Sequence, residues 1–481
     1  MCRAFVSAAF DALAQEHVIP TPAYHRYTAV GRDYFGQSVM NLAQFGALET
    51  HLNQAYPERF ADPLRREHAE FASAYIFSLL EACVARCAPT GSFDAASGAV
   101  SDSIDELRSV LEKSSYEIAC CRQVSHLTTA SGHELRIGDI TVVPEPEGDY
   151  RTLTSRIKEE ISAAPRAWNR ERPSPYGPPH SLLIARVTTE DPDPFGVSKR
   201  VSDTIERFML LARLLTAGTV QSAYQVSGTT TLVTRFNPQM RTFVAGPLHQ
   251  LVRRTVRLTG QEGDAFAGLG DLIDNAAVKR EGMIATSFDV AVSKFNLSYG
   301  SDSPYEHLVD LATAMEAILL GGDKETEGLT LRLRNRAAAL LPADDDPPRA
   351  IFDDVGQLYT LRSKLVHGGR ITQNDLRKVL TRISTVPAET AEHRFGSALA
   401  YAIDRMRDLV RRAILARLCL AEGAEPPWPF DGDTAVDATL ADDAHRAAWR
   451  TYWHERLVAL GAGAAAARPR SAVDFISQED R

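Results

Sequence analysis

The sequence has 481 residues, a formal net charge of −9, 44% apolar residues and 24% charged residues. A chain of this length can form two or three domains with cores of their own, and its composition is that of an ordinary globular protein. The acidic balance excludes a protein coated in basic surface for unspecific binding to nucleic acid, although it leaves a local basic site open.

Residues 1–115 are expected to form an N-terminal helical region. Apolar residues recur at three- and four-residue spacing in 42–57 and 63–87, and 101–113 begins with cap-type residues and acids. We interpret the first residues, MCRAFVSAAFDALAQEH, as an amphipathic helix rather than a signal peptide, because polar and acidic residues soon interrupt the apolar stretch. No uncharged apolar run of about eighteen residues occurs, so no membrane span is expected.

The six cysteines are too few for a disulfide scaffold and indicate a reducing, cytoplasmic location. Cys83 and Cys87 lie one helical turn apart, and Cys120 and Cys121 are adjacent. Neither pair has the C-x2-C spacing of a zinc site, so we interpret these residues as small buried side chains. Neither a metal nor a cofactor is expected.

Residues 116–250 are expected to form an α+β domain with a small sheet. Runs rich in β-branched residues predict strands within 116–124, 133–144 and 181–187. Residues 197–218 predict one long helix. Residues 219–236 predict two further strands that turn around Ser227 and Gly228.

No catalytic motif is evident in this middle domain. It has no P-loop, no G-x-S-x-G and no H-E-x-x-H, and His126, His133 and His180 are scattered. A transferase or hydrolase site there finds little support. We interpret the domain as a sensing or restraining region.

From residue 246 onward, the periodicity of the sequence returns to that of helices. Helices are expected within 246–260, 266–282 and 284–300. Arg253, Arg254 and Arg257 form a basic cluster in the first of these helices, which we interpret first as a surface face and second as a contact for RNA or a partner.

Long helices joined by short loops predict an antiparallel helical bundle over residues 264–420. Its helices are expected at 303–320, 329–341, 348–366 and 391–420. Residues 421–481 form a Pro-rich, low-complexity tail with one short helix, and its last twenty residues are expected to be mobile. The whole is a multidomain, mainly α protein.

The most informative stretch is YTLRSKLVHGG, residues 359–369. Arg362 is always charged and has a planar fork of donors suited to phosphate, while His367 titrates near neutrality. A step of five residues turns an ideal helix by about 500°, so the two side chains point roughly 140° apart. They converge only if the helix ends between them or a second copy contributes. Gly368 and Gly369 are natural helix terminators, which would put His367 in the last turn.

The run 305–379 resembles the Apea-like branch of the HEPN superfamily. The resemblance lies in YEHLVDLATAMEAILL, LTLRLRNRAAALL and IFDDVGQLYTLRSKLVHGG. It implies an antiparallel helical bundle, a homodimer and the R-x4-6-H ribonuclease motif, which Arg362 and His367 match. It also implies that Glu316, in AMEAIL, is the acidic residue facing the motif, and that the chain is a toxin acting in bacterial anti-phage defence by abortive infection.

The expected activity is metal-independent cleavage of RNA by attack of its own 2′-hydroxyl. His367 would be general base or acid, Arg362 would hold the scissile phosphate, and Glu316 would orient one of them. Further phosphate contacts are expected from Ser363, Lys364 and Arg370. The expected partners are RNA, with tRNA as one candidate, a second copy of the chain and an unknown phage or cellular trigger.

Two alternatives remain open. Arg362 and Glu316 could form an interhelical salt bridge while His367 caps the helix end, and the chain would then be a noncatalytic dimerisation or sensor module. The second alternative concerns the basic side chains around the motif. They either contact RNA, or they lie on solvated helix faces and pair with acidic residues elsewhere in the chain. The basic residues concerned are Arg362, Lys364, Arg370, Arg377, Lys378 and Arg382, followed by Arg405, Arg407, Arg411, Arg412 and Arg417.

Overall fold

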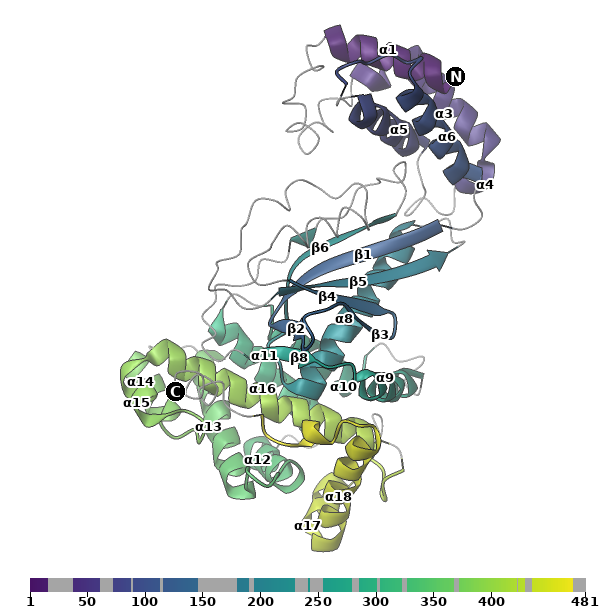
Figure 1. Cartoon of the computed structure of the whole chain (residues 1–481). Coiled ribbons are helices and arrows are strands. Elements are labelled where there is room, and N and C mark those ends of the chain that lie inside the picture. The colour runs from purple at the N-terminus through teal and green to yellow at the C-terminus, as the bar shows by residue number, and fades with distance from the viewer. Residues whose placement is uncertain are drawn as a thin grey trace.

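The structure is a computed structural model that is mainly helical, with a small antiparallel sheet in the middle of the chain, as the sequence predicts. Three parts follow one another along the molecule (Figure 1): the N-terminal helices, the sheet with helix α8, and the C-terminal helices. The structure describes residues 1–15, 38–60, 72–87, 90–112, 116–145, 180–189, 194–229, 241–242, 254–278, 285–300, 303–321, 327–366, 372–421, 423–428 and 435–469.

The N-terminal helices have a hydrophobic cluster of their own. In it, the ring of Phe5 meets that of Phe45 edge to face, with 6.0 Å between the ring centroids. The last helix starts at Gly98, earlier than the sequence indicated, because the Ser97 hydroxyl accepts a hydrogen bond from the amide of Val100 at 3.4 Å. The helices are α1 (Cys2–Gln15), α3 (Ala43–Ala55), α4 (Pro57–Phe60), α5 (Ala72–Cys87) and α6 (Gly98–Glu112).

The main sheet has the strand order β3-β4-β5-β1-β6-β7, and its neighbours pair antiparallel. Helix α8 (Pro194–Thr216) packs against one face, where Arg122 of β1 forms an ion pair with Glu206 of the helix. The strands are β1 (Tyr116–Ser125), β2 (Leu127–Thr129), β3 (Leu135–Ile137), β4 (Ile140–Pro144), β5 (His180–Thr189), β6 (Gln221–Thr229), β7 (Arg241–Thr242) and β8 (Val256–Leu258).

Two sequence predictions are wrong in this region. The turn expected around Ser227 and Gly228 does not form, because both residues pair with β1 and strand β6 continues through them. The helix expected over 246–260 is a strand at Val256–Leu258, paired in parallel with β2. There, Val256 and Leu258 point into the core and Arg257 points to solvent, so tertiary pairing overrides the helical periodicity. The rest of that predicted helix, 246–253, lies outside the described residues.

The C-terminal part is built around the long helix α16. The helix predicted over 391–420 is divided at Arg394, whose φ of −129° and ψ of 74° are not helical. The helices are α9 (Gly263–Val278), α10 (Ser287–Leu297), α11 (Pro304–Leu320), α12 (Leu329–Leu340), α13 (Pro348–Val366), α14 (Gln373–Leu380), α15 (Ala388–His393), α16 (Phe395–Leu420), α17 (Val436–Ala441), α18 (Asp443–Ala459) and the 3-10 turn η4 (Gly463–Ala466).

The sheet region and the C-terminal helices share one hydrophobic core. Tyr299, just after α10, marks the junction. The Cζ atoms of Arg213 and Arg407 lie 4.4 Å and 4.5 Å from the centroid of its ring, so two guanidinium groups contact one aromatic ring. These contacts join α8, α10 and α16.

The C-terminal tail is ordered over much of its length. The Trp449 and Trp453 side chains of α18 are buried, and the indole N–H of Trp453 donates to the carbonyl of Leu340 at 3.2 Å. Ala465 and Ala466 of η4 are buried too, so the expected mobility of the last twenty residues is wrong for 463–466. Residues 470–481 lie outside the described residues. Within the described ranges, no helix combines the length and the apolar character needed to cross a membrane.

Candidate functional site

Helix α13 carries the candidate site in its last turns. Pro348 stands at its first position, and Ile351, Val355, Leu358 and Leu361 form the apolar stripe that holds it against the core. After this anchored stretch the side chains become more accessible. Arg362 and Ser363 are half-buried and Lys364 is exposed, and the described helix ends at Val366, which is also exposed.

Arg362 lies opposite Glu316 of α11, as the resemblance implied. The distance between Nη2 of Arg362 and Oε1 of Glu316 is 4.0 Å, and the exposed fractions of the side chains are 22% and 30%. An ion pair of this length and exposure is weak. The Nε atom of Arg362 is buried without a hydrogen-bond partner, whereas the side chain as a whole is 22% exposed, so the accessible part of the guanidinium is what a ligand could reach.

Tyr359 is a third member of this group that sequence reasoning did not assign. The Cζ atom of Arg362 lies 5.7 Å from the centroid of its ring. Burial raises the pKa of Tyr359, and hydrogen bonding to the Glu316 carboxylate raises it further. The signal in the sequence is the three-residue step from Tyr359 to Arg362, which puts both side chains on one face of a helix. Glu316 therefore faces a phenol and a guanidinium together.

The structure brings together part of the expected site. Arg362 and Glu316 meet, and Ser363 and Lys364 follow Arg362 at the end of α13. His367 and Arg370 lie outside the described residues. The described part of the site thus offers a partly exposed guanidinium and an exposed ammonium group, which suit the binding of a phosphate oxygen, next to a carboxylate that can orient the guanidinium.

The arginines of α16 do not belong to this site. The sequence allowed either RNA contact or solvated helix faces paired with acids elsewhere. Pairing with distant acids is found for Arg405 and Arg412, but neither RNA contact nor a solvated face fits, because these side chains are buried in the core. The reason is that each finds buried acceptors. The residues concerned are Arg405, Arg407, Arg411, Arg412 and Arg417.

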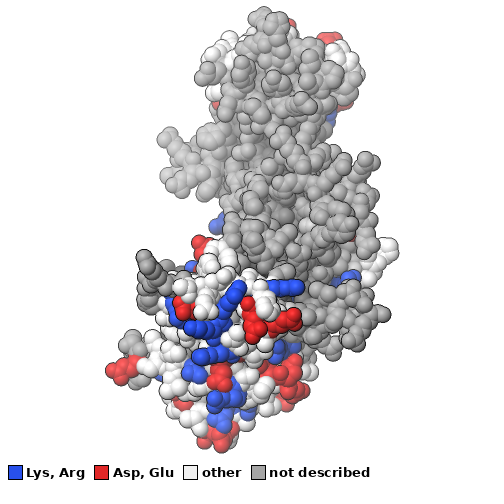
Figure 2. Space-filling model, turned by 90° about the vertical axis from the view of Figure 1, so that its left-hand side faces the viewer, with Lys and Arg blue, Asp and Glu red and all other residues white. Residues whose placement is uncertain are grey.

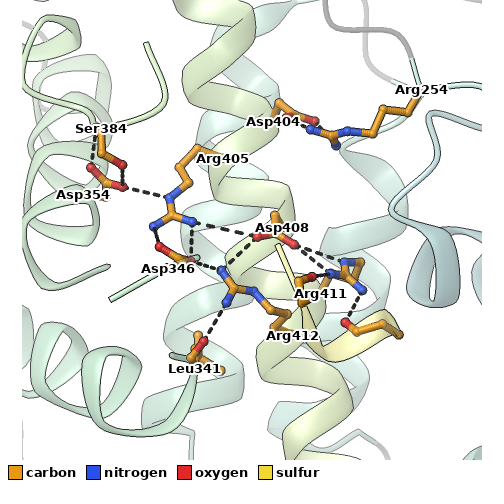
Figure 3. Close-up of polar contacts among 12 residues, drawn as sticks. Arg254, Leu341, Asp346, Asp354, Ser384, Asp404, Arg405, Asp408, Arg411 and Arg412 are labelled. Carbon is orange, nitrogen blue, oxygen red and sulfur yellow. Dashed lines mark hydrogen bonds and ion pairs between the residues drawn. The ribbon is translucent and has the colours of Figure 1, made fainter. Parts of the chain in front are cut away.

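Arg405, Arg411 and Arg412 form a buried ion network with three aspartates (Figure 3). Arg405 donates to both carboxylate oxygens of Asp346, at 2.7 Å and 2.8 Å, and its Nε donates to Asp354 at 2.8 Å. Asp408 accepts from Arg411 at 2.8 Å and forms an ion pair with Arg412 at 2.9 Å.

The charges in this network balance, which explains why it can be buried. Burial raises the pKa of Asp408, but Arg412, Arg411 and Arg405 outweigh that effect and lower it to about 2. Asp354 lies on α13, eight positions before Arg362, and also accepts from the amide and the hydroxyl of Ser384 at 2.7 Å and 2.6 Å. The network therefore fixes α13, the turn after α14 and α16 relative to one another.

The second basic cluster is divided in the structure. Arg254 forms a bidentate ion pair with Asp404 of α16, and both side chains are only 14% exposed. Arg257 is exposed, and Arg253 lies outside the described residues. Arg254 therefore holds the sheet region to the C-terminal helices.

The scattered histidines and cysteines form no site in the described part of the chain. His126 is buried and His133 is exposed, while burial lowers the pKa of His180. The cysteines form no disulfide bond and are buried apart from Cys2, and no cluster of His, Cys, Asp or Glu among the described residues could hold a metal ion. The interpretation of these cysteines as buried side chains is confirmed.

Comparisons of the chain with models of known families, with curated proteins and with solved structures found no match.

Proposed function

We propose that the chain is an endoribonuclease of the HEPN type that cleaves RNA without a metal ion. The observation that carries the proposal is the state of Arg362. Its guanidinium lies at the accessible end of α13, 4.0 Å from Glu316, and its side chain is 22% exposed. A cation held in place with donors to spare is what binding of a scissile phosphate requires.

The proposed roles follow the chemistry of each side chain. Arg362 binds the phosphate and stabilises the charge that develops on it in the transition state. His367, whose unperturbed pKa lies near neutrality, acts as general base or acid toward the 2′-hydroxyl and the leaving oxygen. Glu316 and Tyr359 orient the guanidinium. Additional phosphate contacts come from Ser363, Lys364 and Arg370.

A second copy of the chain completes the proposed site. Because Arg362 and His367 are five positions apart, their directions on one helix would diverge by roughly 140°. Two copies facing each other would bring the arginine of one protomer close to the histidine of its partner. We therefore propose a homodimer with composite sites.

The proposed biological role is that of a toxin in bacterial anti-phage defence, restrained until a trigger acts. This role depends on the resemblance of residues 305–379 to Apea-like HEPN proteins. The N-terminal helices, which have a hydrophobic cluster of their own, are suited to a separate sensing part.

Cleavage assays on the purified full-length chain test the proposal. Total tRNA, a long single-stranded RNA and a matched DNA are incubated with chelator present. We expect cleavage of RNA with cyclic-phosphate ends, no cleavage of DNA, which lacks the 2′-hydroxyl, and loss of cleavage in His367→Ala. His393→Ala is the matched control, because His393 is exposed at the end of α15.

Toxicity on overexpression extends the test to a restrained enzyme. The parent and His393→Ala are expected to arrest growth, and His367→Ala is not. The proposal is overturned if RNA stays intact in every sample and growth does not depend on residue 367.

The contact between Arg362 and Glu316 also supports a second candidate, a noncatalytic dimerisation or sensor module. In that case the pair would hold α11 to α13 and His367 would have no chemical role. Such a module would show no cleavage in vitro and no toxicity, with either residue at position 367.

A further inference from the structure

Helix α14 lies next to the candidate site and presents a basic face. Thr372 and Asp375 form a capping box that starts it. Leu376, Val379 and Leu380 are buried, whereas Lys378 on the other side of the helix is exposed. Arg382, two residues beyond the end of α14, is also exposed.

The end of α13 adjoins this face through Asp375. Hydrogen bonds from Thr372 lower the pKa of Asp375, and the nearby ammonium groups of Lys364 and Lys378 contribute to the shift. A lysine of α13 and a lysine of α14 therefore both lie near one carboxylate. Lys364, Lys378 and Arg382 form a basic row, which continues from Arg362.

Lys364, Lys378 and Arg382 form no ion pair with a carboxylate of the described residues, although Asp375 lies near the two lysines. Exposed arginines elsewhere do have such partners. Arg349, at the start of α13, pairs with Asp353 at 2.7 Å although its side chain is 83% exposed. The positive charge of the basic row is therefore less neutralised within the protein than that of Arg349.

The surface around the basic row is polar. The exposed large hydrophobic residues of the described chain include none between 372 and 394, and Thr372, Gln373, Asn374 and Thr381 are exposed. Figure 2 shows the side of the molecule with α13–α15, where Lys and Arg side chains gather with Asp and Glu among them. Apart from Val366, which is 46% exposed two residues after Lys364, this surface offers little apolar contact to a peptide or a lipid tail, whereas the basic row offers cations to a sugar-phosphate chain.

We propose that the basic row is a track for the phosphate backbone of single-stranded RNA. Lys364, Lys378 and Arg382 each contact one phosphate and lead the strand away from Arg362. The choice of RNA rests on the proposed function, and the row determines which part of a long substrate is held beside the cleaved bond.

Binding of 2′-O-methyl RNA tests the track without cleavage, because the methyl group blocks attack by the 2′-hydroxyl. A fluorescein-labelled 20-mer is titrated with the full-length chain at several salt concentrations. In Lys378→Ala/Arg382→Ala we expect affinity to fall about tenfold at 0.1 M salt. The slope of log K against log salt should shrink by about 1.4, since each lost contact to a single strand removes about 0.7.

Arg349→Ala is the matched control, since it removes an exposed arginine about 20 Å along α13 from Arg362. It should bind like the parent. Equal thermal unfolding of all variants would show that the changes are local. The track is refuted if the double variant keeps the affinity and the salt slope of the parent, or if the parent itself does not bind the RNA.

The binding test of the track and the cleavage test of the proposed ribonuclease can fail independently of each other. If the double variant binds weakly but unmodified RNA is never cleaved, the track stands and the ribonuclease proposal fails. If RNA is cleaved in a His367-dependent way but the double variant binds like the parent, the ribonuclease proposal stands and the track fails.

Discussion

The two arginine-rich regions of the C-terminal helices have the same character in the sequence and opposite fates in the structure. At the end of α13, the Arg362 side chain is 22% exposed and its carboxylate partner is 4.0 Å away. On α16, Arg405 and Arg412 are 1% and 0% exposed, and Asp346 binds both. The first region has cation donors left for a ligand, and in the second the donors hold the fold together. Availability of acceptors, rather than density of arginine, separates the accessible arginine of α13 from the buried arginines of α16.

The largest expected effect comes from breaking the buried network. Asp346→Ala leaves Arg405 and Arg412 buried without their shared carboxylate, so we expect a loss of about 3–5 kcal/mol in the free energy of unfolding. Asp353→Ala is the control, because it breaks only partly exposed pairs with Arg349 and Arg334 and should cost under about 1 kcal/mol. Urea unfolding followed by circular dichroism measures both. Similar losses in the two variants would contradict the distinction between the regions.

At the end of α13 we expect a large effect on activity and a small effect on stability. Under the proposed function, Arg362→Ala should lower the rate of RNA cleavage by about 100-fold or more, as removal of one transition-state donor does. Its unfolding free energy should change by less than about 1 kcal/mol, because the pair with Glu316 is long and half-exposed. Rate and stability measured on the same preparation decide the case. A stable variant with parental activity would remove Arg362 from the mechanism.

The pH dependence of the free energy of unfolding tests the buried network on α16 separately from the end of α13. The pKa of Asp408 is lowered to about 2 in the folded chain, from about 3.9 when unfolded. A lowered folded pKa gives stability that is present above the unfolded pKa and is lost as the pH falls from about 4 toward 2. The loss should reach about 2–3 kcal/mol. Unfolding midpoints between pH 6 and 2 measure it. Asp408→Asn should lose less stability than the parent between about pH 4 and pH 2, because the titrating carboxyl group is gone. If the parent and the variant had the same pH dependence of stability, Asp408 would not be part of such a network.

The smallest expected effect concerns Tyr359. Tyr359→Phe keeps the ring beside Arg362 and removes the hydroxyl that interacts with Glu316. We expect cleavage to fall by about tenfold or less. A hydrogen bond to a charged group contributes about 1.5–3 kcal/mol, and the hydroxyl would act on the phosphate only indirectly, through Glu316 and Arg362. Tyr359→Ala should cost more. If the phenylalanine variant were as inactive as Arg362→Ala, Tyr359 would have a direct chemical role.

Local signals predicted much of the fold. The structure has α13 at Pro348–Val366, the range the sequence predicted, because a proline start and an apolar stripe agree with the packing. The strand β8 could not be predicted, because its pairing with β2 joins residues far apart in the chain.

Only part of the candidate site followed from the sequence. The proximity of Arg362 and Glu316 was predicted through the resemblance, and the distance between them was not. The burial of the α16 arginines was missed because two of their acceptors, Asp346 and Asp354, lie more than fifty positions earlier in the chain. Helical periodicity does not contain that information.

Arg411 is a buried cation whose hydrogen-bond acceptors come from distant parts of the chain on both sides of it. Its Nη1 donates to the carbonyl of Leu214 at 2.9 Å and to that of Ala465 at 2.7 Å, and Nη2 donates to that of Ala467 at 3.1 Å. One of these acceptors is made long before the arginine and two are made long after it. While the ribosome has not yet released Ala467, this buried cation lacks part of its acceptors, and an unpaired buried donor is costly. We therefore expect a chain that ends before Ala465 to leave this buried cation without two of its acceptors.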